Sequence, residues 1–309
     1  MSRPDIHADD YALTLNTSKD MLTCMRAGKL DSISIVPNMS CFEACMALLY
    51  EEIPNLPFLP LMSVHLDFVE GRSLAGRKAV PDLTKPDSDM MGLGWSGLFS
   101  ASYLLGKRKK IKSQLKREIR AQLARVQEAI EKCMETAKRA GVSCGQKGLR
   151  IDSHQHAHMI PVVWEAVSEV VSEEGYALEY IRNSREPLGI FLTEVSLYKT
   201  YRPVNFVKNR LLALYSCRAD RYCRAHGMGQ MYLWGLVMSG RMDRQRVAKL
   251  YAKMKKKAEK DGRTLEILFH PGLTLTDEVT GEIAREAARD FYLRGDRHVE
   301  METVLNMKW

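Results

Sequence analysis

The sequence predicts an α/β fold whose parallel sheet closes, or nearly closes, into a barrel. Seven short segments rich in β-branched and aromatic residues alternate with stretches of helical periodicity, which is the pattern of consecutive β-α units. The chain has 309 residues, 45% of them hydrophobic and 27% charged, so it can bury one large core. An open, doubly wound sheet is the alternative arrangement of the same elements.

The expected elements follow one another through most of the chain. Strands are expected at 4–8, 31–37, 61–68, 148–154, 178–182, 230–237 and 264–270. Helices are expected at 15–28, 41–51, 113–139, 161–174, 203–225, 243–260 and 277–290. We expect residues 1–309 to form a single domain with a helical C-terminal tail at 277–309.

Residues 69–112 interrupt this alternation. Gly, Pro and charged residues lead here into the apolar run MMGLGWSGLFSASYLLG, and the segment is longer than ordinary connections between a strand and a helix. In a parallel barrel such loops lie on the catalytic face, so we expect the insertion to act as a lid. Trp95 within it either stacks on a sugar ring or packs the insertion against the barrel.

The net charge of +8 is concentrated in one stretch. Residues 107–125 hold nine Lys or Arg and a single Glu, so the rest of the chain is balanced. This stretch is either a solvated helix face or a site for nucleic acid or another anionic surface. Leu115 and Ile119 begin an apolar face at helical spacing, which favours the solvated helix, and we expect no nucleic-acid partner.

The remaining composition indicates the compartment. The seven cysteines are odd in number and form no CxxC pair, which argues against a disulfide framework. No apolar run approaches the roughly 20 residues of a membrane span, and the first residues hold no apolar leader. These features predict a cytoplasmic protein without a membrane partner.

The densest group of chemically active side chains is Asp-Ser-His-Gln-His-Ala-His at 152–158. In an extended chain alternate residues share one face. The residues expected to converge are therefore Asp152, His154, His156 and His158. Three imidazoles and a carboxylate are the donors of a metal or catalytic site. Residues two apart on a strand are separated by about 6–7 Å, so only one or two of the four can bind one ion.

Two carboxylates follow the first expected strand, in His7-Ala8-Asp9-Asp10. Adjacent ionised carboxylates repel each other, so a closed site that holds both needs a cation or solvent. On a regular strand they would face opposite ways. Asp9 and Asp10 can therefore reach one site only where the strand ends and the chain turns, with one free to bind a metal and the other to take a proton.

Two further strands end in the same residue types. His65 and Asp67 share a face at the end of the third strand, and Glu266 and His270 share one at the end of the last. Pro-Gly follows His270 and leaves it at the strand tip. The carboxyl edge of a parallel sheet is where sites form, so four strands are expected to deliver Asp or His to one rim.

These residues together resemble the YdjC-like carbohydrate deacetylases of the ChbG type. The resemblance rests on the order His-Ala-Asp-Asp-Tyr, Val-His-Leu-x-x-x-Glu-Gly, Asp-Ser-His-x-His-x-His and Glu-x-x-x-His-Pro, from about residue 5 to 273. It implies a distorted (β/α) barrel of about seven parallel strands, similar to polysaccharide deacetylase barrels. It also implies one divalent metal ion, Mg²⁺ or Zn²⁺, held by Asp10, His65 and His154. Asp9 would be the general base and His270 the general acid.

Further site residues are expected, of which Arg182 comes from the resemblance and the others from the strand ends and the insertion. Contacts to substrate, or support for the metal ligands, are expected from His156, His158, Arg182, Glu266, Asp67 and Trp95. Whether His156 or His158 replaces His154 as a ligand stays open. The sequence departs from the family pattern at Ala12, where Gly usually follows the aromatic residue.

The implied activity is removal of N-acetyl groups from N-acetylated sugars such as chitooligosaccharides, with release of acetate and a free amine. The alternatives are a metal-dependent phosphoesterase, another amidohydrolase, or a non-enzymatic binder of nucleic acid or an anionic surface through 107–125. A homodimer is expected by analogy, because this fold often leaves outer helices free to pair.

Overall fold

The computed structural model describes residues 3–279, 281–283, 292–293 and 296–309, and it contains seven parallel strands in one sheet. The strands are β1 (Asp5–Tyr11), β2 (Ser32–Ile35), β3 (Leu61–Leu66), β4 (Leu149–Ser153), β5 (Leu178–Ile181), β6 (Met231–Trp234) and β7 (Thr264–Phe269). Every expected strand is present.

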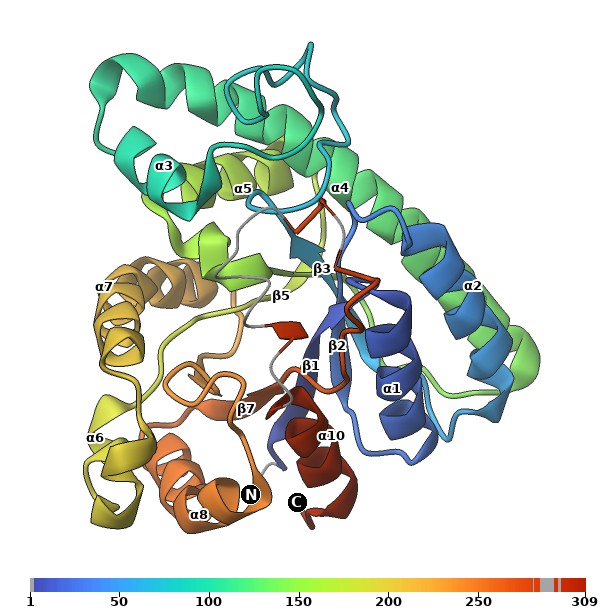
Figure 1. Ribbon diagram of the computed structural model, residues 1–309, viewed down its shortest axis with the longest axis vertical. Helices are drawn as coiled ribbons and strands as arrows, with labels where there is room; N and C mark the ends of the chain where they lie inside the picture. Colours follow the sequence, from blue (N-terminus) through green and yellow to red (C-terminus); the bar gives the residue numbers. More distant parts are fainter. Residues whose placement is uncertain (1–2, 280, 284–291, 294–295) are drawn as a thin grey trace.

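The sheet has the order β5-β4-β3-β2-β1-β7-β6, and all neighbours are parallel. This is the order of a barrel that has been opened between β5 and β6. The sheet curls into a half-barrel with helices around its outside (Figure 1). The expected distorted barrel is thereby confirmed, and the open doubly wound order is not adopted.

The seam between β5 and β6 is closed by loop and side-chain hydrogen bonds. The backbone N–H of Leu233 in β6 donates to the carbonyl of Arg185 after β5 at 2.9 Å. Glu186 is buried and accepts the N–H groups of residues 235–237 at 2.7, 3.1 and 2.9 Å. One carboxylate therefore holds the loop after β6 where the strand ladder is missing.

The helices in the described part of the chain pack mainly on the outer face of the sheet. They are α1 (Leu15–Arg26), α2 (Phe42–Glu52), α3 (Gly94–Ala101), α4 (Leu105–Ala140), α5 (Pro161–Glu173), α6 (Leu188–Phe191), α7 (Pro203–Ala225), α8 (Arg244–Lys260) and α10 (Asp296–Asn306). Short 3₁₀ segments occur at Ile53–Asn55, His154–Met159 and Val195–Thr200. No helix among the described residues is long and apolar enough to cross a membrane.

Local sequence explains where several helices begin and end. Thr14 and Asp243 cap α1 and α8, because their side chains accept backbone N–H groups of the first turn. Pro161 and Pro203 occupy the first positions of α5 and α7, where a missing N–H costs nothing. Gly141 ends α4 in the left-handed conformation, with φ of 71°.

Six of the seven expected helices are present, and the differences concern the start of α4 and the C-terminal part of the chain. The helix expected at 113–139 begins eight residues earlier, at Leu105, because the basic run 107–112 consists of good helix formers. Of the helix expected at 277–290, residues 277–279 and 281–283 form turns and irregular structure instead, and the others lie outside the described residues. Helix α10 lies within the C-terminal tail that was expected to be helical, whereas α3 and α6 were not expected.

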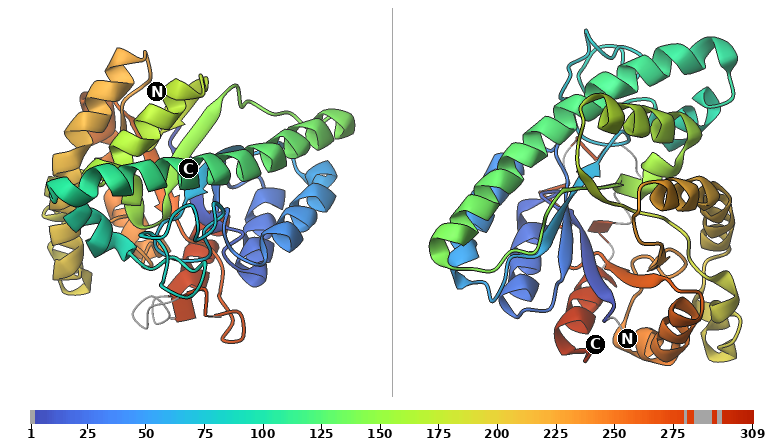
Figure 2. Two further views of the ribbon diagram at one scale, coloured as in Figure 1. Left: turned by 90° about the horizontal axis from the view of Figure 1, so that it is seen from above. Right: turned by 180° about the vertical axis from the view of Figure 1, so that it is seen from behind.

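The insertion at 69–112 is fastened to α4. Glu118 is fully buried and accepts hydrogen bonds from the hydroxyl of Ser73 and from the N–H groups of Leu74 and Ala75. The views in Figure 2 show α4 as the longest helix, with the insertion beside its first half. The role of this insertion as a lid stays a prediction.

The basic face of α4 lies against acidic residues of α5. Lys112 and Lys116 pair with Glu169 at 2.5 and 3.0 Å, and Arg120 pairs with Glu174 at 2.6 Å. On the opposite face Leu115, Ile119, Leu123 and Val126 are fully buried. The segment is therefore an amphipathic helix whose charges are largely paired within the protein.

Candidate active site

A bulge at the end of β1 turns both adjacent carboxylates toward one pocket. The register of β1 against β2 shifts between Ala8 and Tyr11, and Asp10 has φ of 74°. Ala12 follows with φ of 67°, a left-handed conformation that disfavours a side chain. The bulge explains why the family pattern usually has Gly at this position. Its consequence is that Asp9 and Asp10 line the same cavity.

Asp10, His65 and His154 meet at the carboxyl edge of β1, β3 and β4. Asp10 Oδ1 lies 3.2 Å from His154 Nδ1 and 3.6 Å from His65 Nε2. One ligand atom from each residue lies within 4.8 Å of the others, and all three side chains are buried. The fold thus brings together the three residues that the family resemblance suggested as metal ligands.

The expectation that residues 152–158 are extended, with the three histidines alternating on one face, was wrong. Strand β4 ends at Ser153, and His154–Met159 forms a 3₁₀ turn in which Gln155 and His156 have positive φ values of 53° and 58°. Beyond Ser153 the histidines therefore do not alternate at a period of two. His154 and His156 still line the cavity, whereas His158 is absent from its lining.

His158 is instead a buried structural histidine. The backbone N–H of His158 donates to Ser153 Oγ at 2.8 Å, so the Ser153 hydroxyl can donate to Nδ1 at 2.6 Å. Nε2–H then donates to the carbonyl of Arg182 at 2.8 Å. Every polar atom of the neutral ring is satisfied. Burial lowers the pKa of His158 to about 4, which is consistent with a neutral imidazole.

The strand register places a carboxylate behind His65. His65 and Asp152 are paired across β3 and β4, and His65 Nδ1 lies 2.6 Å from Asp152 Oδ1. Nε2 of His65 is consequently the nitrogen that faces Asp10 and His154. A carboxylate on the far nitrogen is the usual arrangement for a metal-binding histidine.

The C-terminal segment makes the corresponding contact to His154. The hydroxyl of Tyr292 lies 2.8 Å from His154 Nε2 and donates to Glu70 Oε2 at 3.0 Å. Arg297 in α10 hydrogen-bonds to Asp10 Oδ2, and its guanidinium lies 5.0 Å from the centre of the Tyr292 ring. Tyr292 and Arg297, which lie near the end of the chain, therefore contact two of the three candidate metal ligands.

The side chains around Asp10, His65 and His154 are suited to a cation. Asp67 Oδ2 and Glu70 Oε1 are buried and have no hydrogen-bond partner within the described structure. Burial lowers the pKa of His154, but the hydrogen bond to Asp10 and the charge of Asp67 outweigh it and raise this pKa to about 10. The acidic groups thus stabilise positive charge where the donor atoms of Asp10, His65 and His154 converge. Two imidazoles and one carboxylate match a catalytic divalent metal site.

A second buried network surrounds Asp9. Arg182 donates to Asp9 Oδ2 and Oδ1 at 2.9 and 2.8 Å, and its Nε donates to Glu266 Oε1 at 2.8 Å. Tyr180 donates to the other oxygen of Glu266. Burial alone raises the pKa of Asp9, but the charges of Arg182 and His65 outweigh it and hold this pKa well below its usual range. Asp9 is therefore ionised and fixed in orientation.

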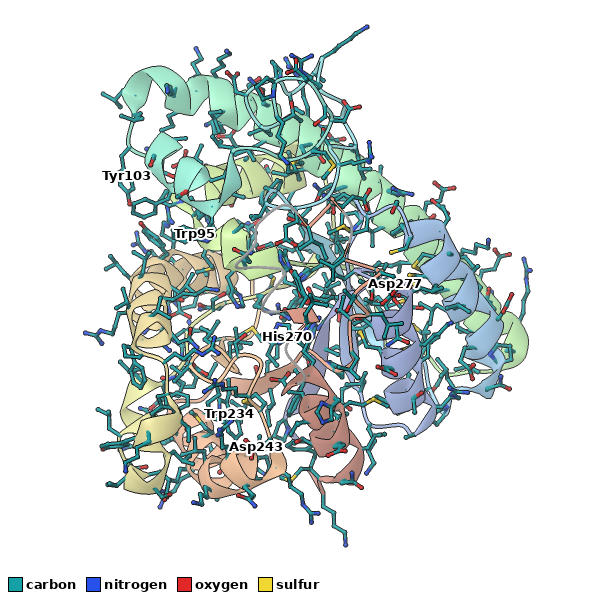
Figure 3. The ribbon with its side chains drawn as sticks, viewed as in Figure 1. Trp95, Tyr103, Trp234, Asp243, His270 and Asp277 are labelled. Carbon is teal, nitrogen blue, oxygen red and sulfur yellow. The ribbon has the colours of Figure 1, made fainter. Side chains whose placement is uncertain are left out.

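The cavity that contains these groups has a volume of about 340 Å³. Its described lining consists of Asp9, Asp10, His65, His154, Gln155, His156, Arg202, Asn205, Lys208, Leu236, Ser239, His270 and Tyr292. His270 follows β7 directly and lies at the centre of the molecule in Figure 3. Burial lowers the pKa of Lys208, which points to this cavity from α7, to about 8.

Other nominated residues lie outside the cavity lining. Asp67 and Glu266 act on the site through His154 and Arg182, as described above. Trp95 stacks on Phe99, which contacts Tyr103, with ring centres 5.5 and 5.3 Å apart. In Figure 3, Trp95 and Tyr103 lie together at α3, away from His270. These ring contacts favour the packing role of Trp95, and its contact with a sugar stays a prediction.

The fold and the site define a half-barrel protein with a buried Asp/His cluster at the carboxyl edge of its sheet. The family model of YdjC-like proteins matches residues 6–133 and 139–308. The chain therefore belongs to the YdjC-like family, as its motifs indicated.

Two known proteins are similar to parts or all of the chain. A carbohydrate deacetylase of Brevibacillus brevis (strain 47 / JCM 6285 / NBRC 100599) is 26% identical over 194 residues, which cover 61% of this chain and 65% of that protein. The match thus spans less than two thirds of this relative. A crystal structure of a "putative cellobiose-phosphate cleavage protein" from Enterococcus faecalis V583 superposes with a TM-score of 0.52 at 14% identity. It covers 97% of this chain and 94% of that one, and it shows the shared fold.

Sequence reasoning missed several residues around the cavity. Tyr292 and Arg297 follow the last strand and belong to no motif, so only tertiary contact identifies them. Arg202 and Lys208 lie at the start of α7, a helix whose position was expected, but helical periodicity does not indicate which end faces a cavity. Glu70 was present in the Val-His-Leu-x-x-x-Glu-Gly motif, and that motif was the available signal.

Proposed function

We propose that the protein is a metal-dependent hydrolase that removes acetyl groups from N-acetylated sugars and releases acetate and a free amine. The observation that carries this proposal is the convergence of Asp10, His65 and His154 in one cavity that Asp9 and His270 also line. The similarity to a carbohydrate deacetylase supports the sugar substrate. Chitooligosaccharides are the first substrates to test.

Asp10 Oδ1, His65 Nε2 and His154 Nδ1 would hold the ion. A bound divalent ion would polarise the amide carbonyl and lower the pKa of water toward 7. Three protein ligands leave positions open for water and substrate, as catalysis requires. Either Mg²⁺ or Zn²⁺ is compatible with the proposal.

Asp9 would accept the proton of the attacking water. It is ionised, lines the cavity, and accepts two hydrogen bonds from Arg182. Oδ2 accepts one of these bonds, from Nη1 of Arg182, so a second lone pair of this oxygen can accept a proton. The fixed guanidinium keeps the carboxylate in one orientation toward the cavity.

His270 would protonate the departing amine. It lies at the tip of β7, beside the carboxyl end of β1, because Ala8 and Phe269 are paired in the sheet. Glu300 in α10 accepts the backbone N–H of His270 at 2.6 Å and thereby fixes the turn that carries it. An imidazole has a suitable proton affinity for this step near neutral pH.

A phosphoesterase with two metal ions is the main rival. His7, Asp9 and Asp152 form another compact group of potential ligands in the described structure. Both ring nitrogens of His7, however, lie 2.6 Å from serine hydroxyls, of Ser32 and Ser34. Arg182 compensates the charge of Asp9 and Asp152, at 2.8 and 3.0 Å. This arrangement favours one metal ion and therefore the deacetylase.

The non-enzymatic alternative is a binder of anionic surfaces through 107–125. It requires available cations, whereas Lys112, Lys116 and Arg120 are paired with α5. It also assigns no role to Asp9 or His270. A cytoplasmic location and a homodimer remain our predictions alongside the proposed activity.

The test is acetate release from N-acetylated mono- and oligosaccharides, with and without a chelator. The proposal predicts release that a chelator abolishes and added metal restores. His154→Ala should fail to retain metal and activity, whereas His226→Ala, on the exposed surface at the end of α7, should behave as the wild type. Phosphate release from sugar phosphates, without acetate release by the same metal-loaded protein, would replace the deacetylase with its rival.

A further inference from the structure

The two imidazoles of the proposed metal site are supported in different ways. Asp152 contacts His65 directly, at 2.6 Å, from the neighbouring strand. The partner of His154 is a tyrosine hydroxyl, at 2.8 Å, from a segment 138 residues further along the chain. A carboxylate stands behind this tyrosine as well, since Tyr292 donates to Glu70 at 3.0 Å.

The direction of these hydrogen bonds determines which nitrogen of His154 can bind a metal ion. The Tyr292 hydroxyl has one proton and donates it to Glu70 Oε2 at 3.0 Å. The oxygen of Tyr292 then accepts from His154 Nε2–H. Nδ1 of His154 faces Asp10 Oδ1 at 3.2 Å, so Nδ1 is the nitrogen that can bind the metal ion after giving up the proton it donates to Asp10.

The ring of Tyr292 is itself firmly held. It is 1% exposed and packs in a small apolar cluster with Leu13, Val36, Met39, Val279 and Ile283. Its plane lies at 24° to that of His154, with ring centres 6.3 Å apart. Arg297 covers the ring from α10 and contacts Asp10 at the same time. The hydroxyl is therefore held in place by packing from several elements.

We propose that Tyr292 is a positioning residue of the metal site, which selects the tautomer and orientation of His154 and couples them to Glu70. The C-terminal segment thus completes a site whose ligands all come from the first half of the chain. This inference rests on the metal-dependent function proposed above. Partners on the far nitrogen of a ligating histidine typically alter metal affinity by about 10–100-fold.

The test is the affinity of the metal-free protein for Zn²⁺, measured by competition with a chromophoric chelator. Tyr292→Phe keeps the packed ring and removes only the hydroxyl, and we expect it to bind Zn²⁺ about 10–100-fold more weakly. Tyr251→Phe is the matched control, because Tyr251 packs on Trp309 near the end of the chain, away from the cavity. Its affinity should equal that of the wild type.

A spectroscopic measurement separates positioning from a general loss of structure. In the Zn²⁺-loaded wild type, ¹⁵N NMR of labelled histidine should show His154 coordinated through Nδ1 with a protonated Nε2. Glu70→Gln should also weaken binding, because an amide can donate to the tyrosine oxygen and reverse the chain of hydrogen bonds.

The outcomes distinguish this inference from the function on which it rests. Equal Zn²⁺ affinity in the wild type and Tyr292→Phe, or coordination of His154 through Nε2, would overturn the role of Tyr292 and leave the metal site intact. A wild-type protein that binds no Zn²⁺, Mg²⁺ or other divalent ion would instead remove the metal-dependent function and this inference together.

Discussion

Two networks of charged side chains in this molecule have similar composition and opposite surroundings. At the carboxyl edge of the sheet, Arg182 is fully buried against Asp9, Asp152 and Glu266. Along α4 and α5, Lys112 and its neighbours pair with Glu169 at the surface, where the side chains of this pair are 28% and 38% exposed. Water screens the second network and is excluded from the first, so the same kind of pair has different consequences.

The buried network is costly to assemble, and its members serve the site. Three carboxylates around one guanidinium would repel one another if the guanidinium were removed. Burial lowers the pKa of Arg182, but Asp152, Asp9 and Glu266 outweigh it and hold the pKa well above its usual value. The buried network should therefore respond strongly to single substitutions, and the surface network weakly.

The largest effect is expected from Arg182→Met. This substitution leaves buried carboxylates without their cation, and breaking such a network typically costs about 3–5 kcal/mol. Urea unfolding of the metal-free protein measures the loss. Arg120→Met is the matched control, because Arg120 makes its ion pairs on the surface of α4. Similar losses in the two variants would remove the distinction between the networks.

The next effect concerns Asp9, which belongs to the buried network and faces the cavity. Asp9→Asn preserves the shape of the side chain and removes its capacity to take a proton. We expect an unchanged Zn²⁺ affinity and a kcat lower by about 10²-fold or more. Asp10→Asn should instead lose metal. An Asp9→Asn protein with near wild-type turnover would show that another group is the base.

A smaller effect is expected from His158, the neutral histidine within the same buried region. Its pKa is about 4 in the folded protein, against about 6.5 in an unfolded chain. Between these values the unfolded chain binds a proton that the folded protein does not. Stability should therefore be complete above pH 6.5 and decline as the pH falls toward 4, by up to about 1.4 kcal/mol per pH unit.

His158→Gln tests this contribution. The charged groups that face His158 are Asp152, Arg182 and His65, and the substitution leaves all three in place. The free energy of unfolding of the metal-free variant should vary less steeply with pH between 4 and 6.5 than that of the wild type. Identical slopes would mean that other groups cause the acid sensitivity.

His158 also shows where sequence reasoning reached its limit. The strand ends and their polar residues were predictable, because alternation and turn signals are local features of the sequence. The strand ends place Asp10, His65 and His154 at one edge of the sheet. The path of the chain beyond Ser153 was not predictable, because positive φ at Gln155 and His156 depends on the surrounding tertiary structure. Tyr292 and Arg297 escaped detection because their partners lie 138 and 287 residues away.

The smallest effect is expected from the surface network. A double-mutant cycle with Lys112→Gln and Glu169→Gln should give a coupling of about 0.2–1 kcal/mol, since exposed pairs gain little over their interactions with water. The coupling should fall further between about 0.05 and 1 M salt, because the screening length falls to about 3 Å at 1 M. A coupling of several kcal/mol, or one insensitive to salt, would mean that α4 and α5 exclude water from this pair. In that case both networks would be shielded from water, and they would differ only in their residues.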